Sequence, residues 1–169
     1  MITDDIVKRN EWGDGVIIGG NFVWAYGGFD SYQVALEMTE NVTAVTTGRM
    51  KPEENQVLKH IPWVTWREWI DILSQYEVGV QLGTASAGTF NLNCSFHGIP
   101  CIGYSNVNTQ KILHPLTTVE VGEIDKAKEI ARKLKDETFY KECMEETEKN
   151  YEKYYSEKKF LEHWDEVWK

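Results

Sequence analysis

Small hydroxyl side chains and glycines gather in the middle of the chain, in the sequence Gly-Thr-Ala-Ser-Ala-Gly-Thr at residues 83–89. Thr84, Ser86 and Thr89 supply hydroxyl groups, and Gly88 would let a ligand approach the backbone. A helix that begins here would point its free N–H groups and its positive dipole end at the same spot. The segment therefore predicts an anion-binding loop. The alternative is a plain turn in which Ser86 or Thr89 only caps the helix.

The residues on either side of this loop predict one complete βαβ unit. Residues 78–82 alternate as a short apolar strand, and residues 89–97 are expected to form a helix that ends at Gly98. Residues 101–103 then form a second buried strand. A crossover this short requires parallel strands, so the loop belongs at the carboxyl edge of a parallel sheet.

Strands and helices alternate along most of the chain. The predicted strands are residues 16–18, 42–46, 61–64 and 117–121, and the predicted helices are residues 30–38, 51–54, 65–73, 124–134, 139–155 and 156–169. Asp30 or Ser31 is the expected cap of the first helix, and Thr65 with Glu68 has the spacing of a capping box. Glycines after the strand ends and short connections predict an α/β three-layer sandwich, with a mainly parallel sheet and helices on both faces.

Composition limits the classes of function. The 169 residues have the length of one domain, and a net charge of −9 argues against a nucleic-acid surface. No apolar run approaches the ~20 residues of a membrane span. Cys94, Cys101 and Cys143 are an odd number without metal-ligand spacing, so we expect a reducing, cytoplasmic setting, with Cys94 and Cys101 as buried filler.

From about Val16 onward, the order of these features resembles the C-terminal, nucleotide-sugar-binding domain of GT-B glycosyltransferases. In that family a glycine turn opens the domain, a later strand ends in glycine, a strand-turn-helix segment receives the base, and a Ser/Gly-rich loop holds the diphosphate. The matching segments are Gly19-Gly20, Gly48, residues 61–69, residues 86–89 and residues 96–102. The resemblance implies one Rossmann-like donor-binding domain over residues 1–169, half of a two-domain enzyme, with closing helices from about residue 124.

The resemblance also implies the ligand, a nucleoside diphosphate sugar. The binding residues expected from it are Gly19, Gly20, Asn21, Gly48, Arg49, Lys51, Trp63, Trp66, Ser86, Ala87, Gly88, Thr89 and Asn93. The phosphates would lie at residues 86–89, and the base between Gly48 and residues 62–66. Trp63 or Trp66 would stack on the base, with core or rim packing as the alternative. Mg²⁺ would come only with the diphosphate, since no residue pattern specifies it.

The departures from the family matter as much as the matches. Retaining members carry two glutamates at positions that here are Ala85 and Asn93, so no catalytic residue is assigned. Arg49 and Lys51 would replace phosphate-contacting cations that the family's first loop carries, with surface salt bridging as the alternative. An N-terminal acceptor-binding domain or a partner subunit would have to complete the enzyme. The alternative function is a non-catalytic or degenerate domain that acts as a partner or interaction subunit.

A third class, a response-regulator-like or flavodoxin-like domain, is weaker, because Asp4 and Asp5 precede the first strand instead of following it. The histidines lack a carboxylate or nucleophile partner at a useful spacing, so each is expected to pack at the surface or half-buried. They are His60, His97, His114 and His163.

The last predicted helix carries a stripe of large apolar side chains. They are Phe160, Leu161, Trp164, Val167 and Trp168, at positions i, i+1, i+4, i+7 and i+8. This stripe is wide enough to need a partner surface. It either lies on the protein's own sheet or stays exposed, and exposure predicts a homodimer through Trp164 and Trp168.

Overall fold

The structure is a computed structural model, and it describes residues 2, 6, 13, 15–20, 26–45 and 58–168. The predictions for Asn21, Gly48, Arg49 and Lys51, and for a helix at residues 51–54, lie outside the described residues. They stay predictions.

One sheet organises the part of the chain that the structure describes. Its strands are β1 (Val16–Ile18), β2 (Val42–Val45), β3 (Lys59–Ile61), β4 (Val78–Gln81), β5 (Cys101–Tyr104) and β6 (Thr118–Val119). They lie in the order β3-β2-β1-β4-β5-β6, and each neighbouring pair is parallel. The expected α/β fold with a mainly parallel sheet is confirmed.

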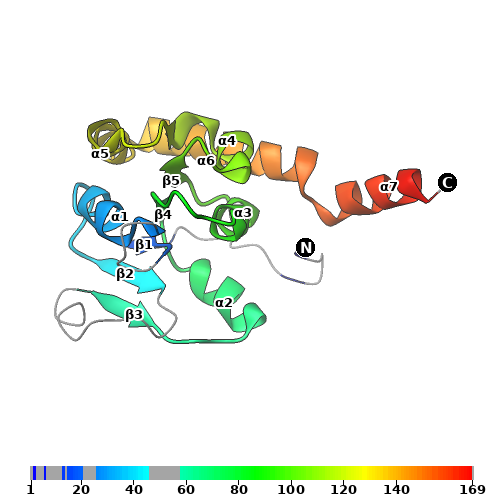
Figure 1. Ribbon diagram of the computed structural model, residues 1–169, viewed down its shortest axis with the longest axis horizontal. Helices are drawn as coiled ribbons and strands as arrows, with labels where there is room; N and C mark the ends of the chain where they lie inside the picture. The colour runs from blue at the N-terminus through cyan, green and yellow to red at the C-terminus, as the bar shows by residue number, and fades with distance from the viewer. Residues whose placement is uncertain are drawn as a thin grey trace.

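Helices cover both faces of this sheet. They are α1 (Gly28–Ala35), α2 (Trp66–Leu73), α3 (Thr89–Phe96), α4 (Asn108–Leu113), α5 (Ile124–Lys133), α6 (Glu137–Tyr154) and α7 (Glu157–Val167), with the 3-10 helix η3 (Pro115–Thr117). α1 and α5 pack on one face, and α2 and α3 pack on the other, which gives the three expected layers (Figure 1). Within the described residues, no helix combines the length and the apolar composition needed to cross a membrane.

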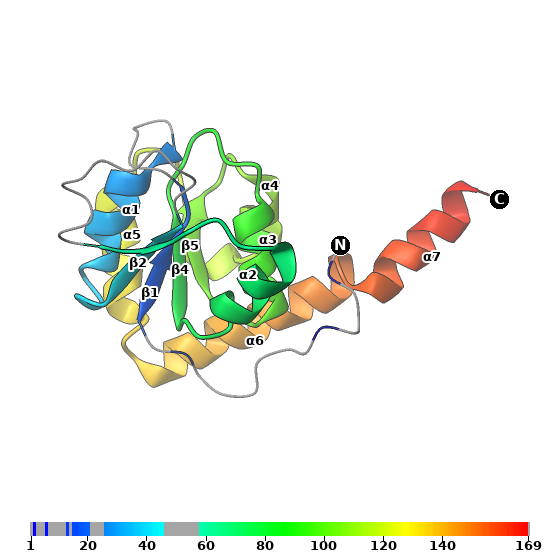
Figure 2. The same ribbon diagram turned by 90° about the horizontal axis from the view of Figure 1, so that it is seen from below.

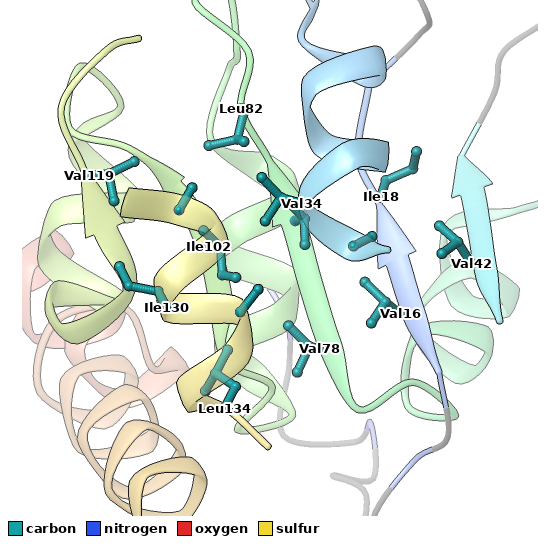
Figure 3. Close-up of a cluster of buried hydrophobic side chains, with 14 of the residues drawn as sticks. Val16, Ile18, Val34, Val42, Val78, Leu82, Ile102, Val119, Ile130 and Leu134 are labelled. Carbon is teal, nitrogen blue, oxygen red and sulfur yellow. The ribbon is translucent and has the colours of Figure 1, made fainter. Parts of the chain in front are cut away.

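The core between the sheet and helices α1 and α5 consists mainly of branched aliphatic side chains (Figure 3). Val16 and Ile18 of β1 belong to this cluster, whereas Ile17 between them packs in a second cluster with α2 and α3. A strand that is covered on both faces has no polar side, which explains why β1 is a continuous apolar run. Full burial of each such side chain contributes about 1.5–3 kcal/mol.

The long helix α6 crosses beneath the amino ends of the strands (Figure 2). Its Tyr140 hydroxyl donates a 3.1 Å hydrogen bond to the carbonyl of Glu77, the residue before β4. Nearer its other end, Tyr151 packs edge-on against Phe96 of α3, with ring centroids 5.7 Å apart. α6 therefore closes the amino edge of the sheet, and the loops after β1 and β4 leave from the opposite, carboxyl edge.

Local sequence signals set the start of α2 as expected. The Thr65 side chain accepts from the Glu68 N–H at 3.4 Å, and the Glu68 carboxylate accepts from the Thr65 N–H at 2.8 Å, so the capping box is confirmed. The strand predicted at residues 61–64 is wrong beyond Ile61. Pro62 has no N–H to continue the ladder, and residues 62–65 connect β3 to α2.

The first helix begins earlier than the sequence predicts. Its N-cap is Gly27, in the left-handed conformation with φ +67°, instead of Asp30 or Ser31. Ser31 is fully buried, and its hydroxyl accepts a 3.0 Å hydrogen bond from the N–H of Leu82. A tertiary contact therefore uses the side chain that local propensity would place at a cap.

The last helix, α7, projects from the body of the molecule and has no buried residue (Figure 1, Figure 2). Phe160 is 45% exposed, Trp164 53% and Trp168 72%. The alternative in which this stripe lies on the protein's own sheet is wrong. The helix begins at the Ser156 cap, whose hydroxyl accepts from the N–H of Lys159.

Candidate functional site

The two central strands, β1 and β4, are the point at which the chain reverses its direction across the sheet. β2 and β3 extend the sheet to one side of β1, and β5 and β6 extend it to the other side of β4. Open α/β sheets bind their ligands outside the carboxyl ends of the strands, at such a switch point. The Gly19 N–H donates to the Val80 carbonyl at 2.9 Å. Gly19 and Gly20 therefore leave the sheet beside residues 83–88, which form the Ser86 loop.

Side-chain hydrogen bonds fix the Ser86 loop. The Ser86 hydroxyl donates to the Gln81 side-chain oxygen at 2.8 Å and accepts from the Gly88 N–H at 3.3 Å. The Asn106 amide donates to the carbonyl of Thr84 at 3.0 Å. The loop is thus held from β4 below it and from the segment after β5 beside it, which gives a preorganised backbone.

The helix that follows this loop begins without a side-chain cap. The N-cap of α3 is Gly88, with φ +77°, and no side chain of the described residues caps the first turn. α1, which follows β1, begins in the same way at Gly27, whereas α2 begins at its Thr65 capping box. The alternative in which Ser86 or Thr89 caps α3 is therefore wrong. Neither helix at the switch point covers its N-terminal N–H groups with a cap of its own.

At two glycines, Gly27 and Gly88, other protein atoms occupy the space that a side chain would take, so this space is not open to a ligand. A methyl group at Gly88 would collide with the hydroxyl of Thr109, which donates to the Gly88 carbonyl at 3.2 Å. A methyl group at Gly27 would collide with the carbonyl of Leu82. The expectation that Gly88 opens the backbone to a ligand is wrong on this side of the residue. The two glycines instead bring α1, the Ser86 loop and the start of α4 into contact.

The tryptophans expected at the base site lie at the carboxyl end of the edge strand β3. Trp63 is 80% exposed in the link between β3 and α2, and Trp66 is 41% exposed in the first turn of α2. Core packing is therefore wrong for both, and packing at the rim stays open as the alternative to base stacking. In the sheet order, β2 and β1 separate β3 from β4, so three strand spacings of about 4.8 Å place the tryptophans roughly 14 Å across the edge from the Ser86 loop.

Of the remaining expected residues, Ala87 and Thr89 are exposed at the start of α3. Asn93 is the fifth residue of that helix and is only 4% exposed. Ala85, the other position at which the family carries a glutamate, is exposed in the Ser86 loop. Of the expected binding residues, the structure therefore brings residues 86–89 and Asn93 together around the start of α3.

A buried polar network supports α3 from behind. The Asn91 amide donates to the Gln110 side-chain oxygen at 2.6 Å, and the Gln110 amide donates to the Cys101 carbonyl at 2.7 Å. The Thr117 hydroxyl donates to the same carbonyl at 2.6 Å. Among the described residues, the side-chain oxygen of Asn91 is buried without a hydrogen-bond partner. The network ties α3 and α4 to β5, which fixes where the N-terminus of α3 points.

His114 lies at the centre of this network. Its Nε2 is 2.9 Å from the Asn91 carbonyl, and its Nδ1 is 3.3 Å from the Cys101 nitrogen and 3.1 Å from the Thr147 hydroxyl. Because a backbone N–H can only donate, Nδ1 must accept and the ring proton is on Nε2. Complete burial lowers the pKa of His114 to about 4, against the smaller opposing effect of the Asn91 carbonyl. The ring is therefore a neutral structural group.

The histidines and cysteines have packing roles, but two histidines are more buried than expected. His97 and His114 are 2% and 1% exposed, so the prediction of surface or half-buried positions is wrong for both. His97 donates from Nε2 to the Ile70 carbonyl at 2.9 Å, which satisfies that ring nitrogen in the core. The three cysteines are buried and form no disulfide. Burial raises the pKa of the Cys143 thiol to about 12, with a further contribution from the nearby Glu142.

Several residues that shape the site were missed from the sequence. Gln81 anchors Ser86, Thr109 fills the space beside Gly88, and Ser31 holds the backbone of Leu82. The role of Gln81 could have been suspected from the sequence, because Gln81 is a polar residue in an otherwise apolar strand. Ser31 gave no such signal, since its partner lies 51 positions later in the chain.

Solved structures share this fold. No protein-family model matches the sequence, and no curated protein sequence matches it either. A point mutant of TarM from S. aureus, crystallised in a complex that includes UDP, superposes with a TM-score of 0.68 at 12% identity over 95% of this chain and 37% of TarM. AviGT4, a glycosyltransferase of avilamycin A biosynthesis, gives 0.67 at 16% identity over 97% of this chain and 52% of its own.

A third match is HepE of Anabaena, crystallised with UDP-glucose, at a TM-score of 0.60 and 10% identity over 82% of this chain and 44% of HepE. The chain thus spans about half or less of the length of these glycosyltransferases. At these identities the likeness concerns the fold. The expected resemblance is confirmed at that level: the chain has the Rossmann-like fold of one domain of the GT-B glycosyltransferases.

Proposed function

We propose that this chain is the donor-binding domain of a glycosyltransferase, which binds a nucleoside diphosphate sugar and presents the sugar to an acceptor. The observation that carries the proposal is the uncapped N-terminus of α3 at the switch point, beside the preorganised Ser86 loop. Two of the matched proteins, TarM and HepE, were crystallised with UDP or UDP-glucose, which supports this class of ligand.

The phosphates are proposed to lie at α3 and not at α1. Both helices begin at a glycine without a side-chain cap, but the first turn of α1 carries Asp30, whereas the first turn of α3 carries no acid. A carboxylate in the first turn already interacts with the positive end of the helix dipole and would repel a diphosphate. The N–H groups of the α3 first turn, starting at Thr89, are the proposed phosphate donors.

The base is proposed to stack on Trp63 or Trp66. Both side chains are exposed at the carboxyl end of β3, and an extended nucleoside diphosphate can span the roughly 14 Å to the Ser86 loop. Asn93 is the proposed partner of a ribose hydroxyl, from its place in the second turn of α3. The contacts predicted for Asn21, Gly48, Arg49 and Lys51 remain part of the proposal.

In this proposal the chain binds and orients the donor but does not complete the reaction. An acceptor must be held on the other side of the sugar, by an N-terminal domain or a partner subunit, because the matched glycosyltransferases are about twice as long or more. Among the described residues, no group of three or more His, Cys, Asp and Glu side chains is arranged so that it could hold a metal ion. Any Mg²⁺ is proposed to come with the diphosphate. A reducing, cytoplasmic setting is also proposed, supported by three unbridged cysteines.

The second candidate is a degenerate domain that keeps the fold and serves as a partner subunit. The observation that favours it is the pair of residues at the family's glutamate positions, an exposed Ala85 and a buried amide at Asn93. Neither side chain can act as a carboxylate. This candidate predicts no nucleotide binding, which separates it from the first.

Isothermal titration of the 169-residue chain with UDP, GDP and ADP tests the proposal. We expect heat of binding with at least one of them at millimolar concentration or below. Thr89→Asp places an acid at the first position of α3, where it stabilises the helix and repels the phosphates. At roughly 5 Å and an effective dielectric constant near 40, one added charge weakens binding about tenfold or more.

Thr138→Asp is the matched control. Thr138 is likewise an exposed threonine in the first turn of a helix, α6, which begins at the amino edge of the sheet, opposite to the Ser86 loop. We expect this variant to bind the nucleotide as the wild type does. No heat with any nucleotide supports the degenerate domain instead, and equal weakening by both variants places the phosphates away from α3.

A further inference from the structure

The last residue of β4, Gln81, lies on the face of the sheet that carries the Ser86 loop and α3. Val78 and Val80 of this strand belong to the core on the α1 and α5 side, so the alternate residues, Gly79 and Gln81, face α2 and α3. In the register of β1 with β4, the residue beside Gln81 is Gly19. Gln81 is half-buried, so a ligand at the carboxyl edge can reach its side chain.

The amide of Gln81 lies between the two central strands. A Cβ atom on Gly19 would be 3.0 Å from the Gln81 Nε2 and 2.8 Å from the ring of Phe90. The amide nitrogen therefore lies over the backbone of Gly19, with the Phe90 ring of α3 beside it. This position is the switch point between β1 and β4.

The two ends of this amide have different roles. Its oxygen accepts from the Ser86 hydroxyl at 2.8 Å, and the same hydroxyl accepts from the Gly88 N–H at 3.3 Å. A hydroxyl has one proton to donate, and that proton goes to Gln81, so the amide oxygen faces Ser86 and the amide nitrogen points away from it. Among the described residues, no group accepts a hydrogen bond from this nitrogen. Within this part of the chain, both of its N–H groups are available to a ligand.

The surroundings of these N–H groups favour a phosphate. Through the Ser86 hydroxyl the amide is connected to the Gly88 N–H at the N-cap of α3, so it lies beside the N–H groups proposed to bind the phosphates. The oxygens of Gln81 and Ser86 already take part in hydrogen bonds within the loop, and the first turn of α3 carries no acid. Donors therefore outnumber acceptors here. Phosphate oxygens only accept, whereas the hydroxyls of a sugar also need an acceptor.

We propose that the Gln81 side-chain amide belongs to the phosphate site, where its nitrogen donates to a phosphate oxygen of the nucleotide while its oxygen holds the Ser86 loop. This inference rests on the proposed function. It gives Gln81 two roles, binding of the ligand and support of the loop, and one substitution can separate them.

Gln81→Glu makes this separation. The glutamate keeps an oxygen for the Ser86 hydroxyl, so the loop should keep its conformation, but a negative charge replaces the N–H donors. Isothermal titration uses whichever of UDP, GDP and ADP binds the wild type most tightly. We expect the variant to bind this diphosphate about tenfold more weakly or worse, because a charge-assisted hydrogen bond is replaced by repulsion.

Gln75→Glu is the matched control. It makes the same substitution and the same change of net charge at an exposed position three residues before β4 begins, at the amino edge of the sheet. This variant should bind the diphosphate as the wild type does.

The side-chain amide of Gln81 also gives a signal of its own in the ¹⁵N-labelled wild type, which does not depend on how a variant folds. On saturation with the diphosphate, its two N–H protons should shift downfield in the NMR spectrum, as expected for donors to a charged oxygen. The matching nucleoside, which lacks phosphates, should leave them in place.

The outcomes separate this inference from the proposed function. If the wild type binds the diphosphate but Gln81→Glu binds it no more weakly than Gln75→Glu, and the amide signals do not move, Gln81 has no part in the phosphate site and the donor-binding domain stands. Signals that move equally with the nucleoside place Gln81 at the base or ribose and also overturn the inference. A wild type that binds no nucleotide overturns both.

Discussion

The buried imidazole of His114 makes the stability of the fold depend on pH in a range where few other groups titrate. Its pKa in the folded protein is about 4, below the usual 6.5, because it is completely buried. The unfolded chain binds the proton more tightly than the folded chain does, so protonation favours unfolding. The contribution of His114 is complete above pH 6.5 and is lost as the pH falls toward 4.

The size of the effect follows from the two pKa values. A difference of about 2.5 units corresponds to about 3 kcal/mol in full, of which about 2 kcal/mol is lost between pH 7 and pH 5. Some carboxylates also have lowered pKa values, such as Glu37 beside Arg132 and Glu68 at the α2 cap. Their contribution to the stability of the fold is also lost on acidification, but only below about pH 4.5, the usual pKa of a glutamate. The interval from pH 7 to pH 5 therefore separates the histidine from the acids.

Urea denaturation of the wild type and of His114→Gln at pH 7 and pH 5 measures this contribution. The variant is less stable at both values, because it leaves the Cys101 N–H without its acceptor, but its loss between them should be about 2 kcal/mol smaller than that of the wild type. His163→Gln, on the exposed helix α7, should keep the full loss. An NMR titration of the folded wild type in which the His114 ring protonates near pH 6.5 would refute the reasoning.

Three further predictions concern single contacts. Ser31→Ala removes the acceptor of the Leu82 N–H and should lower the free energy of unfolding by about 1–3 kcal/mol, measured by urea denaturation; an unchanged midpoint contradicts the role assigned to it. Gly88→Ala should lower the Tm of the ligand-free protein, because the backbone of Gly88 is left-handed and the Thr109 hydroxyl occupies the space that a Cβ atom would need. A variant that loses only nucleotide affinity contradicts this. Trp63→Phe and Trp66→Phe should reduce the quenching of fluorescence by bound UDP, and two variants that titrate like the wild type exclude both tryptophans from the base site.

The parts of the fold that depend on neighbouring residues in the sequence were predictable. β1 lies where the apolar run between glycines predicts it, and the Thr65 capping box needs only a spacing of three. The start of α1 was not predictable, because the Ser31 hydroxyl does not cap the helix but accepts a hydrogen bond from Leu82, 51 residues away. The burial of His114 was equally hidden, since its three partners come from α3, β5 and α6.

The candidate site divides in the same way. The glycines and hydroxyls of the Ser86 loop, and the helix after them, were visible as a local pattern. The sequence also shows that the first turn of α1 carries an acid and that of α3 does not. This difference bears on the phosphate site only because both helices begin without side-chain caps after adjacent strands, which the structure showed. What fixes the loop, through Gln81 and Thr109, required the tertiary structure.

The central position of β1 in the sheet has a consequence during synthesis. Val16 pairs with Val78, about 60 residues later in the chain, so β1 lacks one of its two neighbours until β4 has been made. At 5–20 residues per second the ribosome needs roughly 3–12 s to reach that point. For that time the nascent chain carries an apolar strand with an open edge. The strand is only three residues long, with Gly15 before it and Gly19 after it, which limits how far a misplaced partner can extend along it.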